Sequence, residues 1–275
     1  MIAVSIRTWM RLTILALACA GMLPAMASAD VRHETGAQPR PAPAARARIF
    51  GHVRDFNGKP IEGADVELKT ARFENAAATR SAADGSYSLT VESGLYIALA
   101  AVKDYRVRQL EYWAWNVPAF GEVEIDPRFD RLEVYGLNAW RPQGGFPSYE
   151  VYFRPMSLTM TVAAVTKAGG MDKLGDLPFI DIAPDLAAKD IAVKIDGESV
   201  EVLCVNKVHE ASGPAQALFG YLIQTPLPKA PGSGDWITIE VTLTDPSTGE
   251  KGEGRLYLAR PRYVPASAPG GPGKD

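Results

Sequence analysis

The sequence is poor in the residues that metal binding and nucleophilic catalysis most often use. Among its 275 residues are two cysteines, Cys19 and Cys204, and three histidines, His33, His52 and His209. No two of these have the spacing of metal ligands. Nucleophile elbows, phosphate-binding loops and dinucleotide fingerprints are missing as well. We therefore expect no catalytic residue, no bound metal and no cofactor.

The N-terminus has the layout of a secretory signal. Two arginines precede an apolar run at 12–23, which is too short to span a bilayer, and residues 27–29 are small, as signal peptidase requires. Residues 1–29 are therefore predicted to be a cleaved Sec-type signal, which places the protein in the periplasm or outside the cell. A lipoprotein anchored at Cys19 is the alternative. We expect no transmembrane helix after cleavage.

Removal of the signal makes the chain more acidic and leaves one cysteine. It removes two arginines, so that 27 basic side chains face 32 acidic ones, a net charge of about −5. Such a charge argues against nucleic acid as a partner. Cys204 then has no partner for an intramolecular disulfide, and its place in the alternating run 200–205 predicts a half-buried structural thiol.

The remaining pattern predicts an all-β protein. Short alternating segments are separated by Gly, Pro, Asn and Asp, which is typical of sandwiches and barrels. Residues 158–165 are among the predicted strands, Asp196-Gly197 predicts a hairpin, and helical periodicity is lacking except for one turn at 185–189. We expect two tandem β-sandwich domains between flexible Pro-rich ends, with these bounds: linker 30–47, first sandwich 48–155, second sandwich 156–263 and disordered tail 264–275.

One motif follows the linker. It has the order G-x-V-x-D, G-x-P-I-x-G-A-x-V, T, D-G-x-Y-x-L and G-x-Y. Its residues are Gly51, Val53 and Asp55; Gly58, Pro60, Ile61, Gly63, Ala64 and Val66; Thr79; Asp84, Gly85, Tyr87 and Leu89; and Gly94 and Tyr96. In this motif the chain resembles the carboxypeptidase regulatory-like domain, a transthyretin-like (prealbumin-like) sandwich. The resemblance implies an accessory structural or binding module. The second domain resembles a bacterial Ig-like sandwich more loosely.

Aromatic residues near the end of the first sandwich are the best candidates for a binding site. On an extended strand, Trp113 and Trp115 project from the same face about 6.5–7 Å apart, a spacing at which two rings could stack on successive sugars. Nearby donors and rings complete the predicted ligand-binding set: Asn138, Trp140, Arg141, Gln143 and Tyr149. The alternative is that Trp113 and Trp115 fill the core or an interdomain joint, since large aromatics are mostly buried.

Three functional hypotheses follow. The leading one is a non-catalytic exported envelope protein that binds glycan or protein through the aromatic surface of the N-terminal sandwich. The second is a structural or assembly subunit of an envelope complex, with its aromatics buried. The third is a hydrolase that uses carboxylates on loops, which no motif supports.

Overall fold

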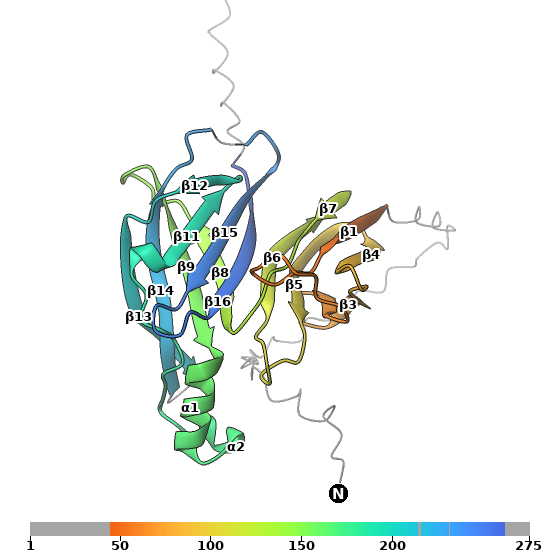
Figure 1. Cartoon of the computed structure of the whole chain (residues 1–275). Helices are drawn as coiled ribbons and strands as arrows, with labels where there is room; N and C mark the ends of the chain where they lie inside the picture. Colours follow the sequence, from red (N-terminus) through yellow and green to blue (C-terminus); the bar gives the residue numbers. More distant parts are fainter. Residues whose placement is uncertain (1–44, 214–215, 231, 262–275) are drawn as a thin grey trace, which may run out of the picture. The chain divides into compact units, whose positions relative to one another are not determined.

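Strands dominate the part of the chain that the computed structural model describes, which is residues 45–213, 216–230 and 232–261 (Figure 1). The all-β prediction is confirmed. The predicted signal, nearly all of the linker and the predicted tail lie outside the described residues. The linker prediction reaches too far, because strand β1 already begins at Arg46.

The strands form three sheets. The N-terminal sheet has the order β4 (Ser86–Glu92), β1 (Arg46–His52), β7 (Glu122–Glu124). The shared sheet has the order β12 (Glu198–Val200), β11 (Ile191–Ile195), β15 (Trp236–Thr244), β16 (Lys251–Ala259), β6 (Tyr112–Ala119), β5 (Gly94–Val102), β2 (Asp65–Lys69), β3 (Asn75–Arg80). The C-terminal sheet has the order β10 (Phe179–Ile180), β14 (Gln216–Pro226), β9 (Ser148–Ser157), β8 (Leu132–Trp140), and β13 (Cys204–Gly213) also pairs with β14.

The shared sheet contributes to two hydrophobic cores, one on each face. Successive side chains of a strand point to opposite faces, so Tyr112 and Ala114 of β6 enter the core beneath the N-terminal sheet. Trp113 and Trp115 enter the core beneath the C-terminal sheet. Strand β6 pairs antiparallel with β5 and parallel with β16, which joins the strands of both sandwiches by main-chain hydrogen bonds.

The predicted boundary at residues 155/156 falls inside a strand. Residue 155 belongs to β9, which pairs with β8 and with β14, so residues 132–157 lie in the same sheet as strands from the C-terminal half. The N-terminal sheet ends before this point, at β7, although the core beneath it also contains Tyr257 of β16. Where the chain divides into independently folding domains stays a prediction.

A glycine lets the second sandwich close tightly. Gly252 of β16 lies under β8, where a Cβ atom would stand 2.0 Å from the carbonyl oxygen of Leu132. Real Cβ atoms do not come so close to another backbone. The two backbones therefore meet here because this position carries no side chain.

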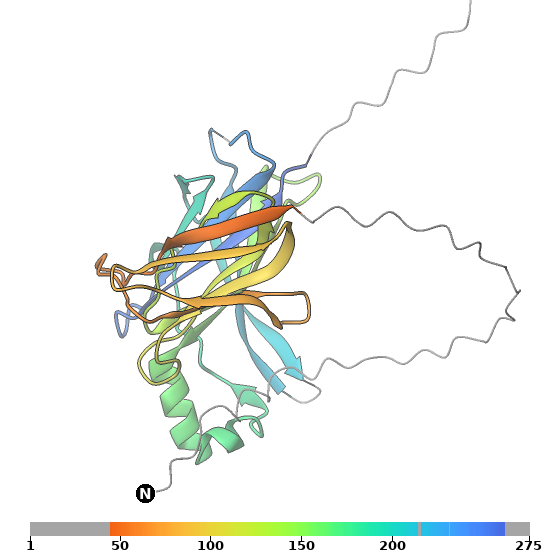
Figure 2. The same ribbon diagram turned by 90° about the vertical axis from the view of Figure 1, so that its right-hand side faces the viewer.

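The strand predicted at 158–165 is wrong, because this segment is helix α1 (Leu158–Ala168). Ser157 caps its N-terminus, since the hydroxyl accepts a hydrogen bond from the Met160 amide at 3.2 Å. Only Leu158 is buried, so the alternating apolar residues face mostly outward. Helix α1 and the short α2 (Met171–Leu174) project beyond the strand ends (Figure 2). The turn predicted at 185–189 is a 3-10 turn, η2 (Ala188–Asp190).

Candidate ligand-binding groove

The expectation that Trp113 and Trp115 face water is wrong. Their exposed fractions are 6% and 8%. The two rings stack on each other with centroids 5.2 Å apart, and Tyr135 meets both edge-on at 5.3 and 5.2 Å. The cause is the position of β6, whose two faces are both covered by other sheets. The two indoles therefore belong to the core, as the alternative interpretation expected.

A buried carboxyl lies beside this aromatic cluster. The Trp113 Nε1–H donates to Glu133 Oε1 at 3.0 Å, and the Glu111 amide donates to Glu133 Oε2 at 3.4 Å. Burial raises the pKa of Glu133 well above its ordinary value, with the Glu111 charge adding to the effect. Burial also raises the pKa of Glu111 to about 7, although Lys69 and Arg106 oppose the shift. We interpret Glu111 and Glu133 as a structural pair that belongs to the contact between β6 and β8.

Among the described residues, the exposed tryptophan is Trp140, at the end of β8, with an exposed fraction of 45%. It lies on the rim of an open groove of about 630 Å³ at the mouth of the second sandwich. The groove has apolar walls from Ile237 of β15 and Leu258 of β16. Its lining includes four predicted site residues: Trp140, Arg141, Gln143 and Tyr149.

The other predicted residues lie elsewhere. Trp113 and Trp115 are in the core, and Asn138 is exposed on β8, where its Oδ1 accepts a hydrogen bond from the Ala139 amide at 2.8 Å. Side chains along a strand alternate between faces. Asn138 therefore leaves the sheet on the face opposite to Ala139, which is in the core beneath the C-terminal sheet. Trp140 leaves the strand on that same exposed face, but Asn138 is not among the residues that line the groove. The structure thus brings four residues of the predicted set together at the groove and leaves Trp113, Trp115 and Asn138 outside it.

A second hollow of about 260 Å³ shares Arg141 and Tyr149 with the groove and adds charged groups that the sequence analysis missed. Arg260 Nη2 donates to Asp196 Oδ2 at 2.6 Å. Burial opposes ionisation of Asp196, but hydrogen bonds from Arg260 and from the Thr238 and Gly232 amides outweigh it and lower its pKa. The sequence predicted Asp196 only as part of a turn: the Asp196-Gly197 motif indicates a hairpin, and the structure confirms this hairpin between β11 and β12.

Tyr149 presents a neutral phenol to this hollow. Burial raises the pKa of Tyr149, although the positive charges of Arg141 and Arg260 oppose the shift. Within the described part of the chain, the Arg141 guanidinium makes no hydrogen bond or ion pair and is exposed. The hollow therefore offers a free guanidinium and a phenol hydroxyl beside an internally paired Arg260.

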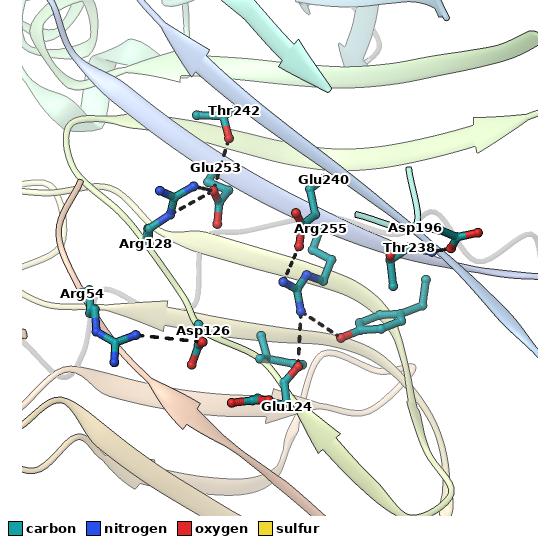
Figure 3. Close-up of polar contacts among 12 residues, drawn as sticks. Arg54, Glu124, Asp126, Arg128, Asp196, Thr238, Glu240, Thr242, Glu253 and Arg255 are labelled. Atoms are coloured by element: carbon teal, nitrogen blue, oxygen red, sulfur yellow. Dashed lines mark hydrogen bonds and ion pairs between the residues drawn. The ribbon is translucent and has the colours of Figure 1, made fainter. Parts of the chain in front are cut away.

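A separate polar cluster ties the first sandwich to the shared sheet (Figure 3). Arg128, which follows β7, donates through Nε to Glu253 of β16 at 3.1 Å, and Thr242 donates to the same carboxylate at 3.2 Å. Arg255 pairs with Glu240 and donates to the Glu124 carbonyl at 3.3 Å. Burial raises the pKa of Glu253, although Arg128 opposes the shift. These contacts link elements that are far apart in the sequence, although the buried Nε of Arg255 has no hydrogen-bond partner among the described residues.

The described residues hold no group of three or more His, Cys, Asp or Glu side chains that could bind a metal ion. Across residues 45–213, 216–230 and 232–261, no helix is long and apolar enough to cross a bilayer. Cys204 is exposed, so the half-buried position expected for it is wrong. The residue is at the start of β13, and Asn206 Nδ2 approaches its sulfur at 3.9 Å.

The sheets and cores define an all-β protein of packed β-sheets. No family model and no curated protein matches the chain. Among solved structures, BcpA, the major pilin subunit of Bacillus cereus, shows 13% identity and a TM-score of 0.26 over 77% of this chain and 67% of that chain. A DUF3823 family protein from Bacteroides ovatus shows 11% identity and a TM-score of 0.24 over 77% of this chain and 99% of that chain. At these TM-scores the comparisons carry no argument about this chain.

Proposed function

We propose that this chain is a non-catalytic exported protein that binds glycan in the groove at the mouth of the second sandwich. The observation that carries the proposal is the exposed Trp140 indole on the rim of an apolar groove, next to the donors Arg141 and Gln143. A flat ring can stack on the C–H face of a sugar, while guanidinium and amide groups donate to its hydroxyls. The surface proposed from the sequence thus moves from the first sandwich to the second.

Exchange of Trp140 for alanine tests this function. Trp140→Ala removes the stacking ring, and we expect a loss of glycan affinity of about five- to thirty-fold, since ring stacking and its buried area are worth about 1–2 kcal/mol. Phe146→Ala is the matched control, because Phe146 is 61% exposed in the same loop and is not among the residues that line the groove. Glycan arrays identify a ligand, and calorimetry measures its affinity for each variant. Equal affinity of both variants and the parent would eliminate this groove as the site.

Two finer assignments belong to the same proposal. Residues from Gly51 to Tyr96 form a carboxypeptidase regulatory-like module, which is supported by the burial of the motif residues Val66, Tyr87 and Leu89 in one core. The protein works in the periplasm or outside the cell after cleavage behind Ala29. Mass spectrometry of the exported protein tests the second assignment, because an intact N-terminus on the exported chain would contradict it.

A structural or assembly role is the second candidate function. It is favoured by the burial of Trp113 and Trp115 and by the continuous sheet that joins both sandwiches, which together give a stiff unit. Co-purification of a partner in fixed stoichiometry, with glycan arrays negative, would favour this role over glycan binding.

A further inference from the structure

We propose that the groove selects an acidic glycan, and that Arg141 and Tyr149 bind the carboxylate of a uronic acid in the smaller hollow. This inference rests on the proposed glycan-binding function and names the class of glycan. Both side chains line the smaller hollow as well as the groove, so one ligand could contact the Trp140 rim and reach this pair.

The charges of the hollow favour an anion. Its lining carries two guanidinium groups, Arg141 and Arg260, against the single carboxylate of Asp196. Arg260 is already engaged, since its Nη2 donates to Asp196 at 2.6 Å and its Nε donates to the Gly234 carbonyl at 2.8 Å. The excess positive charge is therefore on Arg141. A guanidinium with free donors matches a carboxylate in geometry and charge.

Tyr149 adds a neutral donor. Its exposed fraction is 4%, so its ring is fixed by packing in the second core. Because burial keeps the phenol protonated, the hydroxyl can donate to a carboxylate oxygen without adding charge. Arg141 and Tyr149 then supply donors from two different positions of the chain, the first from the loop after β8 and the second from β9.

The remainder of the groove fits a sugar chain better than a bare anion. Trp140 offers a ring of the kind that stacks on pyranose faces, and Gln143 offers an amide for hydroxyls. Ile237 and Leu258 supply apolar surface below them. A uronic acid combines an apolar ring face, hydroxyls and one carboxylate, which are the three chemistries present here.

Calorimetry on the full chain with matched ligands tests the inference. The probes are galacturonate, mannuronate and glucuronate oligosaccharides, each compared with its carboxyl-reduced neutral counterpart. We expect at least one acidic probe to bind about tenfold or more tightly than its neutral counterpart, and raising salt from about 0.05 M to about 0.5 M to weaken it. If every neutral counterpart bound as tightly as its acidic probe, the inference would be overturned.

Variants separate the carboxylate contact from general charge. Arg141→Gln should lose about tenfold or more in affinity for the acidic probe but only a few-fold for the neutral one, and Tyr149→Phe should lose a few-fold for the acidic probe. Arg72→Gln removes the same charge at an exposed position in the β2–β3 turn and should have no effect. Arg141→Gln with unchanged selectivity would contradict the inference.

The outcomes distinguish the two proposals. Binding of neutral glycans that depends on Trp140 but not on Arg141 would retain the proposed function and reject the acidic ligand. Failure of every glycan to bind would reject both. If an acidic peptide bound through Arg141 and no glycan bound, the occupant of the groove would be a protein, and the inference would likewise be rejected.

Discussion

Ionisation of Glu111 should make the protein less stable as the pH rises, and Glu111→Gln should reduce that loss. The Glu111 pKa is raised from 4.5 to about 7, with burial as the largest cause. A carboxyl with a raised pKa binds more protons in the folded state than in the unfolded state. Its contribution is therefore fully present below pH 4.5 and is lost as the pH rises through about 7. One pH unit corresponds to about 1.4 kcal/mol, so the loss amounts to about 3 kcal/mol.

Urea denaturation, followed by tryptophan fluorescence between about pH 5 and about pH 8, measures this effect. The free energy of unfolding of Glu111→Gln should be close to that of the parent at the lower pH and exceed it by up to about 3 kcal/mol at the higher pH. Glu74→Gln removes an exposed carboxyl between β2 and β3 and should follow the parent throughout. If Glu111→Gln showed the same pH slope as the parent, the buried acid would not be the source, and the reasoning from burial would be refuted.

Three further predictions concern packing. Gly252→Ala should lower the free energy of unfolding by about 2–3 kcal/mol because the new Cβ would meet the Leu132 backbone, while Gly94→Ala, with open space around it, should change it by less than about 0.5 kcal/mol in urea titrations. Trp113→Ala should lower the free energy of unfolding by about 3–5 kcal/mol, whereas Trp140→Ala should change it little. Trp140→Ala should also remove most of the tryptophan fluorescence that acrylamide quenches. A fragment of residues 156–261 lacks β8 and most of β9 and should stay unfolded by circular dichroism; cooperative unfolding would support the predicted boundary.

The sequence is sufficient to predict strands and turns where one face of a strand is buried. In β15, Ile237, Ile239, Val241 and Leu243 alternate inward as predicted, and all four lie in the core. The Asp196-Gly197 turn is confirmed for the same reason: short-range geometry fixes it. Predictions of this kind need only the period of the pattern and the turn residues.

Long-range pairing could not be predicted in the same way. The run Tyr112-Trp113-Ala114-Trp115 is apolar on both faces, which indicates a strand covered on both sides, but its hydrogen-bonded neighbour β16 is more than a hundred residues further along the chain. The prediction of an exposed aromatic face considered one side of β6 only. The helix at 158–168 was missed because Leu158, Met160 and Val162 alternate with threonines like the residues of a strand, whereas the Ser157 cap is a weaker signal.

The candidate site was predicted in part for a physical reason. Trp140, Arg141 and Gln143 are close in sequence, so a single loop brings them to one rim. Asp196 lies in the β11–β12 hairpin and Arg260 follows β16, so both are far from that loop in the sequence. No local pattern connects them to it. Their contribution became visible only through the sheet order that places β11, β15 and β16 next to one another.

The contacts between the two sandwiches also explain why a ligand could bind in the proposed groove without a rearrangement of the strands that form it. The groove is built on β8, β15 and β16. At the other end of these strands, β8 rests directly on Gly252, and Glu253 and Arg255 are held by groups of the first sandwich. Because β16 is packed on both faces, a ligand that enters the groove would not have to order this strand, and its interaction energy would go into affinity rather than into folding the site. On this argument the first sandwich supports binding by stiffening the second, although it contributes no residue to the groove.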